Sequence, residues 1–121
     1  MDLMTRRRAM MAAAAAAGGQ MESGTFTPDT AATAFSISVA SEPAHLAVYS
    51  INADFGTENV WNLESLQWHA DDRLVGIYRY GTSNLNANTY GSVSFADGLL
   101  TVSGLRYALR AGKAYHWFAW T

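Results

Sequence analysis

Three histidines, His45, His69 and His116, are the side chains in this sequence that most readily suggest a metal site. None of them forms an HxH or HExxH pair, and each falls in a segment with the pattern of a β-strand. Closed metal sites usually have tighter ligand spacing, so we interpret these residues as surface or half-buried histidines. The chain has no cysteine, which excludes disulfides, thiolate metal sites and a cysteine nucleophile.

Two groups of carboxylates could also do chemistry. Asp54 and Glu58 lie in a loop rich in asparagine, where oxygen atoms could hold calcium, but the spacing is not that of an EF-hand and a plain polar loop explains them. Glu64 could pair with Asp71 or Asp72 for glycoside hydrolysis, although a turn accounts for both aspartates. The chain lacks GxSxG, P-loop and GxGxxG motifs. The sequence therefore predicts no catalytic residue, no metal and no cofactor.

Aromatic side chains are numerous in the middle of the chain. Exposed ones could stack on sugar rings, while Asn84, Asn86 and Asn88 could bond to hydroxyl groups. The alternative is that these rings form the core, which we favour because Trp and Tyr dominate the cores of small β-domains. The candidates for glycan contact are Trp61, Trp68, Tyr78, Tyr80 and Tyr90.

Residues 1–21 form a basic, alanine-rich leader. It carries Arg6, Arg7 and Arg8, followed by residues 9–17, which are alanines interrupted by Met10 and Met11. Alanine favours about two turns of helix here, ended by the glycines that follow. An export signal fits less well, because alanine makes a weak apolar region, and the apolar run is too short to span a membrane. A plain tail is a further alternative, but we expect a docking arm whose partner contacts are these arginines and methionines.

Charge is unevenly distributed along the chain. Three arginines against one aspartate give residues 1–21 a net charge of +2, and five basic groups against nine acids give residues 22–121 a net charge of −4. A basic leader can dock on an acidic partner or on the body of a neighbouring copy. Nucleic-acid binding is not expected, because the basic residues of the body are scattered and outnumbered.

The body, residues 22–121, reads as short strands separated by turns. Apolar and polar residues alternate in several segments, and Asp97-Gly98 is a strong hairpin signal. Residues 104–110 could form a strand or a short helix, and 81–88 are polar and turn-rich. The expected strands are 25–27, 34–40, 44–51, 65–70, 73–80, 90–95, 99–103 and 113–120. This pattern predicts an all-β fold, an antiparallel β-sandwich or jelly roll of about seven to eight strands.

The last segment, residues 113–120, is aromatic on both faces. Tyr115 and Trp117 share one face, while His116, Phe118 and Trp120 share the other. Such a strand needs a two-sided environment, so we expect it to be central in a sheet or to pack against another subunit.

The two ends of the chain resemble those of a known class of proteins. The opening TRRRAMMAAAAAAGG resembles the start of many small phage and prophage virion proteins. The segment from Glu22 to Pro28 and the closing YHWFAW look like β-domains of tail-fibre, receptor-binding and head-decoration proteins. The resemblance leaves the middle of the chain unmatched. It implies a non-enzymatic homo-oligomer, often a trimer, that is attached to capsid or tail proteins through its N-terminal arm.

The expectation that follows is a phage virion accessory protein located in the virion. A carbohydrate-binding module, secreted or on a cell surface, is the first alternative, and the two can coexist because virion domains often bind surface glycans. A small hydrolase is the third alternative. It requires two carboxylates or histidines that converge in a pocket.

Overall fold

The computed structural model describes residues 20–51, 60–71, 73–81 and 84–121. These residues form nine antiparallel strands in two sheets, and none of them is helical. The strands are β1 (Met21–Phe26), β2 (Phe35–Ser38), β3 (His45–Ser50), β4 (Trp61–His69), β5 (Leu74–Tyr80), β6 (Asn84–Asn88), β7 (Ser92–Ala96), β8 (Leu99–Ser103) and β9 (Tyr115–Trp120). The expected all-β sandwich is thus confirmed. No helix in these ranges could cross a membrane.

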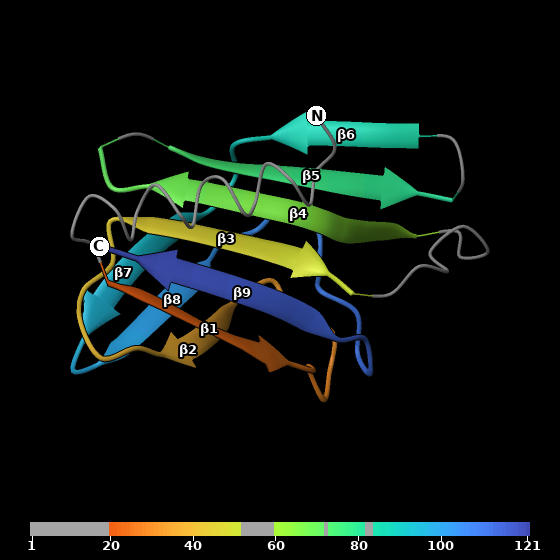
Figure 1. Cartoon of the computed structure of the whole chain (residues 1–121). Helices are drawn as coiled ribbons and strands as arrows, with labels where there is room; N and C mark the ends of the chain where they lie inside the picture. Colours follow the sequence, from red (N-terminus) through yellow and green to blue (C-terminus); the bar gives the residue numbers. More distant parts are fainter. Residues whose placement is uncertain (1–19, 52–59, 72, 82–83) are drawn as a thin grey trace.

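A six-stranded sheet in the order β1-β9-β3-β4-β5-β6 packs on a three-stranded sheet in the order β2-β8-β7 (Figure 1). The core lies between the inner faces of the two sheets. There Leu46, Val48 and Leu66 of the large sheet form one buried cluster with Leu100 and Val102 of β8. Alternate side chains of a strand point to opposite faces, which is why the alternating segments of the sequence each supply one row of this core.

Strand β9 lies inside the large sheet, between β1 and β3. The expected central position of the aromatic segment is therefore confirmed. Tyr115, Trp117 and Ala119 point into the core, while Phe118 and Trp120 belong to a second cluster. The indole of Trp117 lies over Gly24 of β1, and a Cβ added there would meet Trp117 Nε1 at 2.9 Å.

The hairpin expected at Asp97-Gly98 joins β7 and β8. Both residues have positive φ angles, 54° and 76°. Asp and Gly tolerate this left-handed conformation, which the tight two-residue hairpin turn requires at both positions.

Two segments differ from the expectation. Polar residues 84–88 form β6, which pairs with β5 at the edge of the large sheet. Residues 105–111 form neither strand nor helix and make one isolated bridge, Ala32 to Leu109. Leu105 and Leu109 are both buried in the core. The four-residue spacing of Leu105 and Leu109 therefore belongs to a loop whose two leucines both pack in the core, and not to a helix.

The sandwich has two distinct ends. The register places Met21 opposite Trp120, Trp120 opposite His45, and His45 opposite His69, all at one end of the large sheet. We call this the terminal end, because the backbone N–H of Thr121 donates to the carbonyl of Gln20 at 2.9 Å. The opposite end, where β4 begins and β5 finishes, is called the distal end (Figure 1).

Candidate functional site

The distal end carries a row of aromatic and polar side chains on the inner face of the large sheet. Trp61 of β4 pairs with Tyr80 of β5, and Tyr80 pairs with Asn84 of β6. Directly opposed residues share a face of the sheet. Six strands face only three, so this part of the inner face extends beyond the strands of the small sheet.

The loop of residues 105–111 supplies the other wall. Tyr107 stacks on Trp61 with ring centroids 5.1 Å apart and planes at 18°. Tyr80 lies 5.3 Å from Trp61 at a tilt of 51°. Tyr107 also meets the edge of Tyr78 at 5.0 Å. These contacts fix the orientation of the rings, because stacked and edge-to-face pairs add to the burial energy of each ring.

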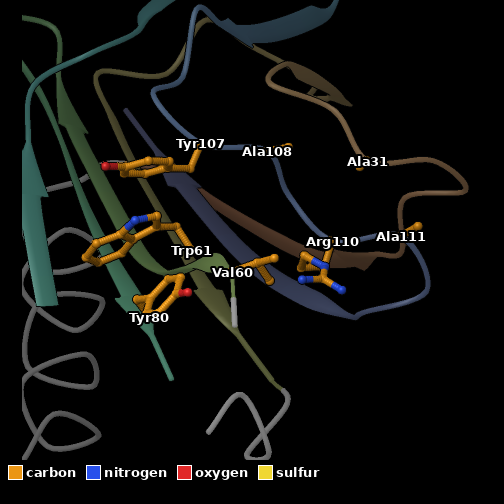
Figure 2. A pocket seen from close by; sticks show the side chains of 8 residues that line it. All are labelled: Ala31, Val60, Trp61, Tyr80, Tyr107, Ala108, Arg110 and Ala111. Atoms are coloured by element: carbon orange, nitrogen blue, oxygen red, sulfur yellow. The ribbon is translucent and has the colours of Figure 1, made fainter. Parts of the chain in front are cut away.

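A cleft of about 630 Å³ opens between the sheet and this loop. Its lining comprises Trp61, Tyr80, Tyr107, Val60, Arg110 and three alanines. Figure 2 shows Trp61 and Tyr80 side by side on one side of the cleft, with Arg110 across from them. The volume is that of a small-molecule site, and mostly apolar walls with a few polar groups are typical of such sites.

Two arginines lie at the cleft, since Arg110 lines it and Arg106 packs on the ring of Tyr107. The Arg106 guanidinium lies 5.0 Å from the ring centroid of Tyr107 and 5.9 Å from that of Tyr90. The backbone N–H of Arg110 donates to the Tyr115 hydroxyl at 3.0 Å, which ties the loop to the core. None of the described lining residues is a carboxylate. Among the described residues, the cleft therefore combines ring faces, tyrosine hydroxyl groups and an arginine.

The five aromatic candidates from the sequence lie in different places. Trp61 and Tyr80 line the cleft. Trp68 packs against the core near the terminal end, and Tyr78 is fully buried, so the core interpretation applies to it. Tyr90 is 59% exposed and lies outside the cleft lining.

Sequence reasoning missed Tyr107 and Arg110. Both belong to a loop bracketed by Gly104 and Gly112, which have φ angles of 70° and 74°. This glycine pair is the signal that could have identified residues 105–111 as a loop, because positive φ interrupts a regular strand or helix.

The three histidines divide into a pair and a single residue. His45 and His69 face each other across β3 and β4, with Nδ1 atoms 2.6 Å apart, beside a cavity of about 390 Å³ that Asp71 also lines. Burial lowers the pKa of His45, the charge of His69 lowers it further, and Asp71 opposes the shift. His116 instead stacks on Phe118. No group of three or more potential metal ligands occurs in the described ranges.

Of the two carboxylate pairs considered for glycoside hydrolysis, Glu64 with Asp71 lies within the described residues, and these two side chains do not converge. Glu64 accepts a hydrogen bond from Arg79 at 3.0 Å in the middle of β4. Asp71 lies beyond the end of the same strand, beside His69. The five residue steps along the strand from Glu64 to His69 correspond to about 16 Å, which exceeds the separation of roughly 10 Å or less that such enzymes use.

Several candidates lie outside the described residues. These are the docking-arm residues Arg6, Arg7, Arg8, Met10 and Met11, the calcium candidates Asp54 and Glu58, and Asp72.

No family model matches the chain, and no curated protein or solved structure shows significant similarity to it.

Proposed function

We propose that the chain is a phage virion accessory protein, a non-enzymatic β-sandwich that is attached at its terminal end and presents its distal end outward. The resemblance of both chain ends to small virion proteins motivates the assignment. Capsid or tail proteins are the partners, and the attached form is a homo-oligomer.

The observation that carries the proposal is the polarity of the sandwich. The leader joins the body at Gln20, beside Thr121 at the terminal end. The Trp61–Tyr80–Asn84 row lies at the other end of the large sheet. An anchor at the terminal end therefore leaves the aromatic cleft facing away from the particle.

A specific observation favours glycan binding as the task of the distal end. Trp61 and Tyr80 present ring surface at a cleft, and the exposed Asn84 lies beside Tyr80 on the same face. Aromatic rings can pack on the C–H face of a sugar, while amide and hydroxyl groups bond its hydroxyls. The flanking Arg106 and Arg110 favour an acidic sugar.

The virion assignment is tested by deleting residues 2–19. The full chain is expected to co-sediment with gradient-purified particles, and the shortened chain to stay in the soluble fraction with the circular dichroism of the folded body. Equal incorporation of the two proteins would contradict attachment through the arm.

The glycan assignment is tested with a glycan array followed by calorimetry on the best ligand. Tyr80→Ala should weaken binding by about ten-fold, equivalent to about 1.4 kcal/mol. Tyr90→Ala is the matched control, because Tyr90 is an exposed tyrosine outside the cleft. The affinity of this variant for the ligand should stay within two-fold of that of the parent protein. An array without signal for the folded protein, or equal losses in both variants, would count against the distal cleft.

A further inference from the structure

Two histidines meet at the terminal end of the large sheet. His45 of β3 lies directly opposite His69 of β4 in the antiparallel register. In the next pair along, the N–H of Ala70 donates to the carbonyl of Ala44 at 2.8 Å. Hydrogen-bonded and non-hydrogen-bonded pairs alternate along antiparallel strands, and side chains lie closest in the non-hydrogen-bonded pairs. The backbone therefore brings the two imidazoles together on one face of the sheet.

The two rings turn nitrogen atoms towards each other. The Nδ1 atoms of His45 and His69 are 2.6 Å apart, which is short even for a hydrogen bond from N–H to oxygen, at about 2.7–3.2 Å. The ring planes are nearly perpendicular, at 84°. A neutral imidazole that carries its proton on Nε2 has a free lone pair on Nδ1. In that tautomer, two nitrogen lone pairs are available at one point between β3 and β4.

One ring is held in place and the other can adjust. The His45 ring stacks on the indole of Trp120, with centroids 5.3 Å apart and planes at 19°. Trp120 lies opposite His45 in the register of β3 and β9, so the backbone of three strands supports this stack. His69 is exposed to solvent, and rotation about its side-chain bonds can change the distance between the two nitrogens.

The surroundings leave room for an ion and its water. The two histidines line a cavity of about 390 Å³ together with Ala44, Ala70 and Asp71, and a water molecule occupies about 30 Å³. The negative charge of Asp71 acts on His45. The three polar side chains do not form a three-ligand set in the described ranges, so Asp71 contributes its charge rather than a direct bond.

We propose that His45 and His69 form a two-histidine site for a late divalent transition-metal ion, with water in the remaining coordination positions. Bonds from such ions to histidine nitrogen are about 2.0–2.1 Å long. Two nitrogens that bind at angles of about 90–109° are then about 2.9–3.4 Å apart, which requires the pair to widen by less than about 1 Å. Rotation of the His69 side chain supplies this movement.

The donor atoms select the ion. Imidazole suits Zn²⁺, Ni²⁺ and Cu²⁺, and the affinity of a nitrogen site is highest for Cu²⁺ among the first-row divalent ions. Calcium and magnesium prefer oxygen ligands and should not compete. A bound ion would join β3 to β4 beside the chain ends, far from the aromatic cleft. The inference is therefore independent of the virion and glycan proposals.

The sequence analysis set metal ligation aside because the histidines are widely spaced. His45 and His69 are 24 residues apart, and the register of β3 and β4 supplies the proximity that this spacing does not show.

The test is a Cu²⁺ titration of the full chain after dialysis against EDTA and then against metal-free buffer. Cu²⁺ quenches a nearby indole, so saturation at one ion per chain should quench part of the tryptophan fluorescence, because Trp120 stacks on one of the ligands. EDTA should restore the signal. Zn²⁺, followed by calorimetry, should bind at the same stoichiometry and raise the Tm.

His69→Gln removes one ligand at an exposed position, and circular dichroism checks that this variant is folded. The dissociation constant for Cu²⁺ should rise by at least about ten-fold, since loss of a group that merely orients a ligand already costs about 10–100-fold. His116→Gln is the matched control, because His116 stacks on Phe118 and lies outside the pair. The Cu²⁺ affinity of this control should stay within two-fold of that of the parent protein.

Electron paramagnetic resonance of the Cu²⁺ complex of the parent protein gives a readout that needs no variant. The spectrum should show coupling to two imidazole nitrogens. A spectrum with one imidazole nitrogen or none would overturn the site, as would equal Cu²⁺ affinity of His69→Gln and the parent protein. Absence of saturable binding of both Cu²⁺ and Zn²⁺ to the folded parent protein would overturn it as well.

Discussion

Two tyrosines of the core differ in one respect that allows a controlled experiment. Tyr78 and Tyr115 are both 0% exposed. The Tyr115 hydroxyl accepts a hydrogen bond from the Arg110 N–H at 3.0 Å. The Tyr78 hydroxyl is near the backbone of Arg106, but no described group meets hydrogen-bond geometry with it. Replacing each tyrosine by phenylalanine therefore removes the same atom from two different environments.

The expected changes have opposite signs. A buried polar group without a partner costs about 1–3 kcal/mol, so Tyr78→Phe should raise the free energy of unfolding by about 1 kcal/mol after the lost contacts of the oxygen are deducted. Tyr115→Phe leaves the Arg110 N–H without its acceptor and should lower the free energy of unfolding by about 1–2 kcal/mol. For a body of this size, 1 kcal/mol corresponds to a change in Tm of about 4–8 °C.

Urea titrations followed by tryptophan fluorescence measure both variants, and unchanged m-values would show that the unfolded state is the same. Burial raises the pKa of Tyr78 to about 12. The folded state thus favours the neutral phenol. The contribution of the neutral phenol to folding stability is present below pH 10 and is lost as the pH rises through 12. Tyr78→Phe should remove that part of the alkaline destabilisation. If Tyr78→Phe instead lowers the free energy of unfolding by more than 1 kcal/mol at neutral pH, the Tyr78 hydroxyl has a hydrogen-bond partner and the prediction is wrong.

Three further predictions concern other parts of the fold. Burial and the charge of His69 lower the pKa of His45, so the stability that neutral His45 contributes is present above pH 6.5 and is lost as the pH falls towards the depressed pKa. Thermal melts of the parent protein should therefore show a falling Tm over this pH range, and melts of His45→Gln should show a smaller fall. Gly24→Ala should lower the free energy of unfolding by about 1–3 kcal/mol, since the new Cβ meets Trp117, and an unchanged urea midpoint would refute the close approach. Removing residues 115–121 deletes the strand between β1 and β3, and we expect the shortened chain to lack a cooperative melting transition.

Local alternation was enough to predict most of the sheet. It identified 99–103 as a strand and placed the aromatic C-terminal segment in the middle of a sheet, because both of its faces need cover. It failed at the start of β4, where the register shifts between Leu63 and Ser65. The resulting bulge places Leu63 and Leu66 in the same core at a spacing of three, which hides the period of two.

The candidate cleft could be predicted only in part. Trp61 and Tyr80 were candidates from their residue types, but their pairing depends on the register of β4 and β5. The position of Tyr107 against Trp61 depends on Leu105 and Leu109 holding their loop in the core. Such long-range packing leaves no periodic trace in the sequence, so the second wall of the cleft required the structure.

Whether the chain is a virion component can be measured by protein mass spectrometry of density-purified particles from the organism that encodes it. If the chain is attached to the particle, peptides of residues 22–121 should co-purify with the major capsid or tail proteins at a fixed ratio that survives a salt wash. Recovery of the chain only from the particle-free fraction, at every step of the gradient, would contradict it.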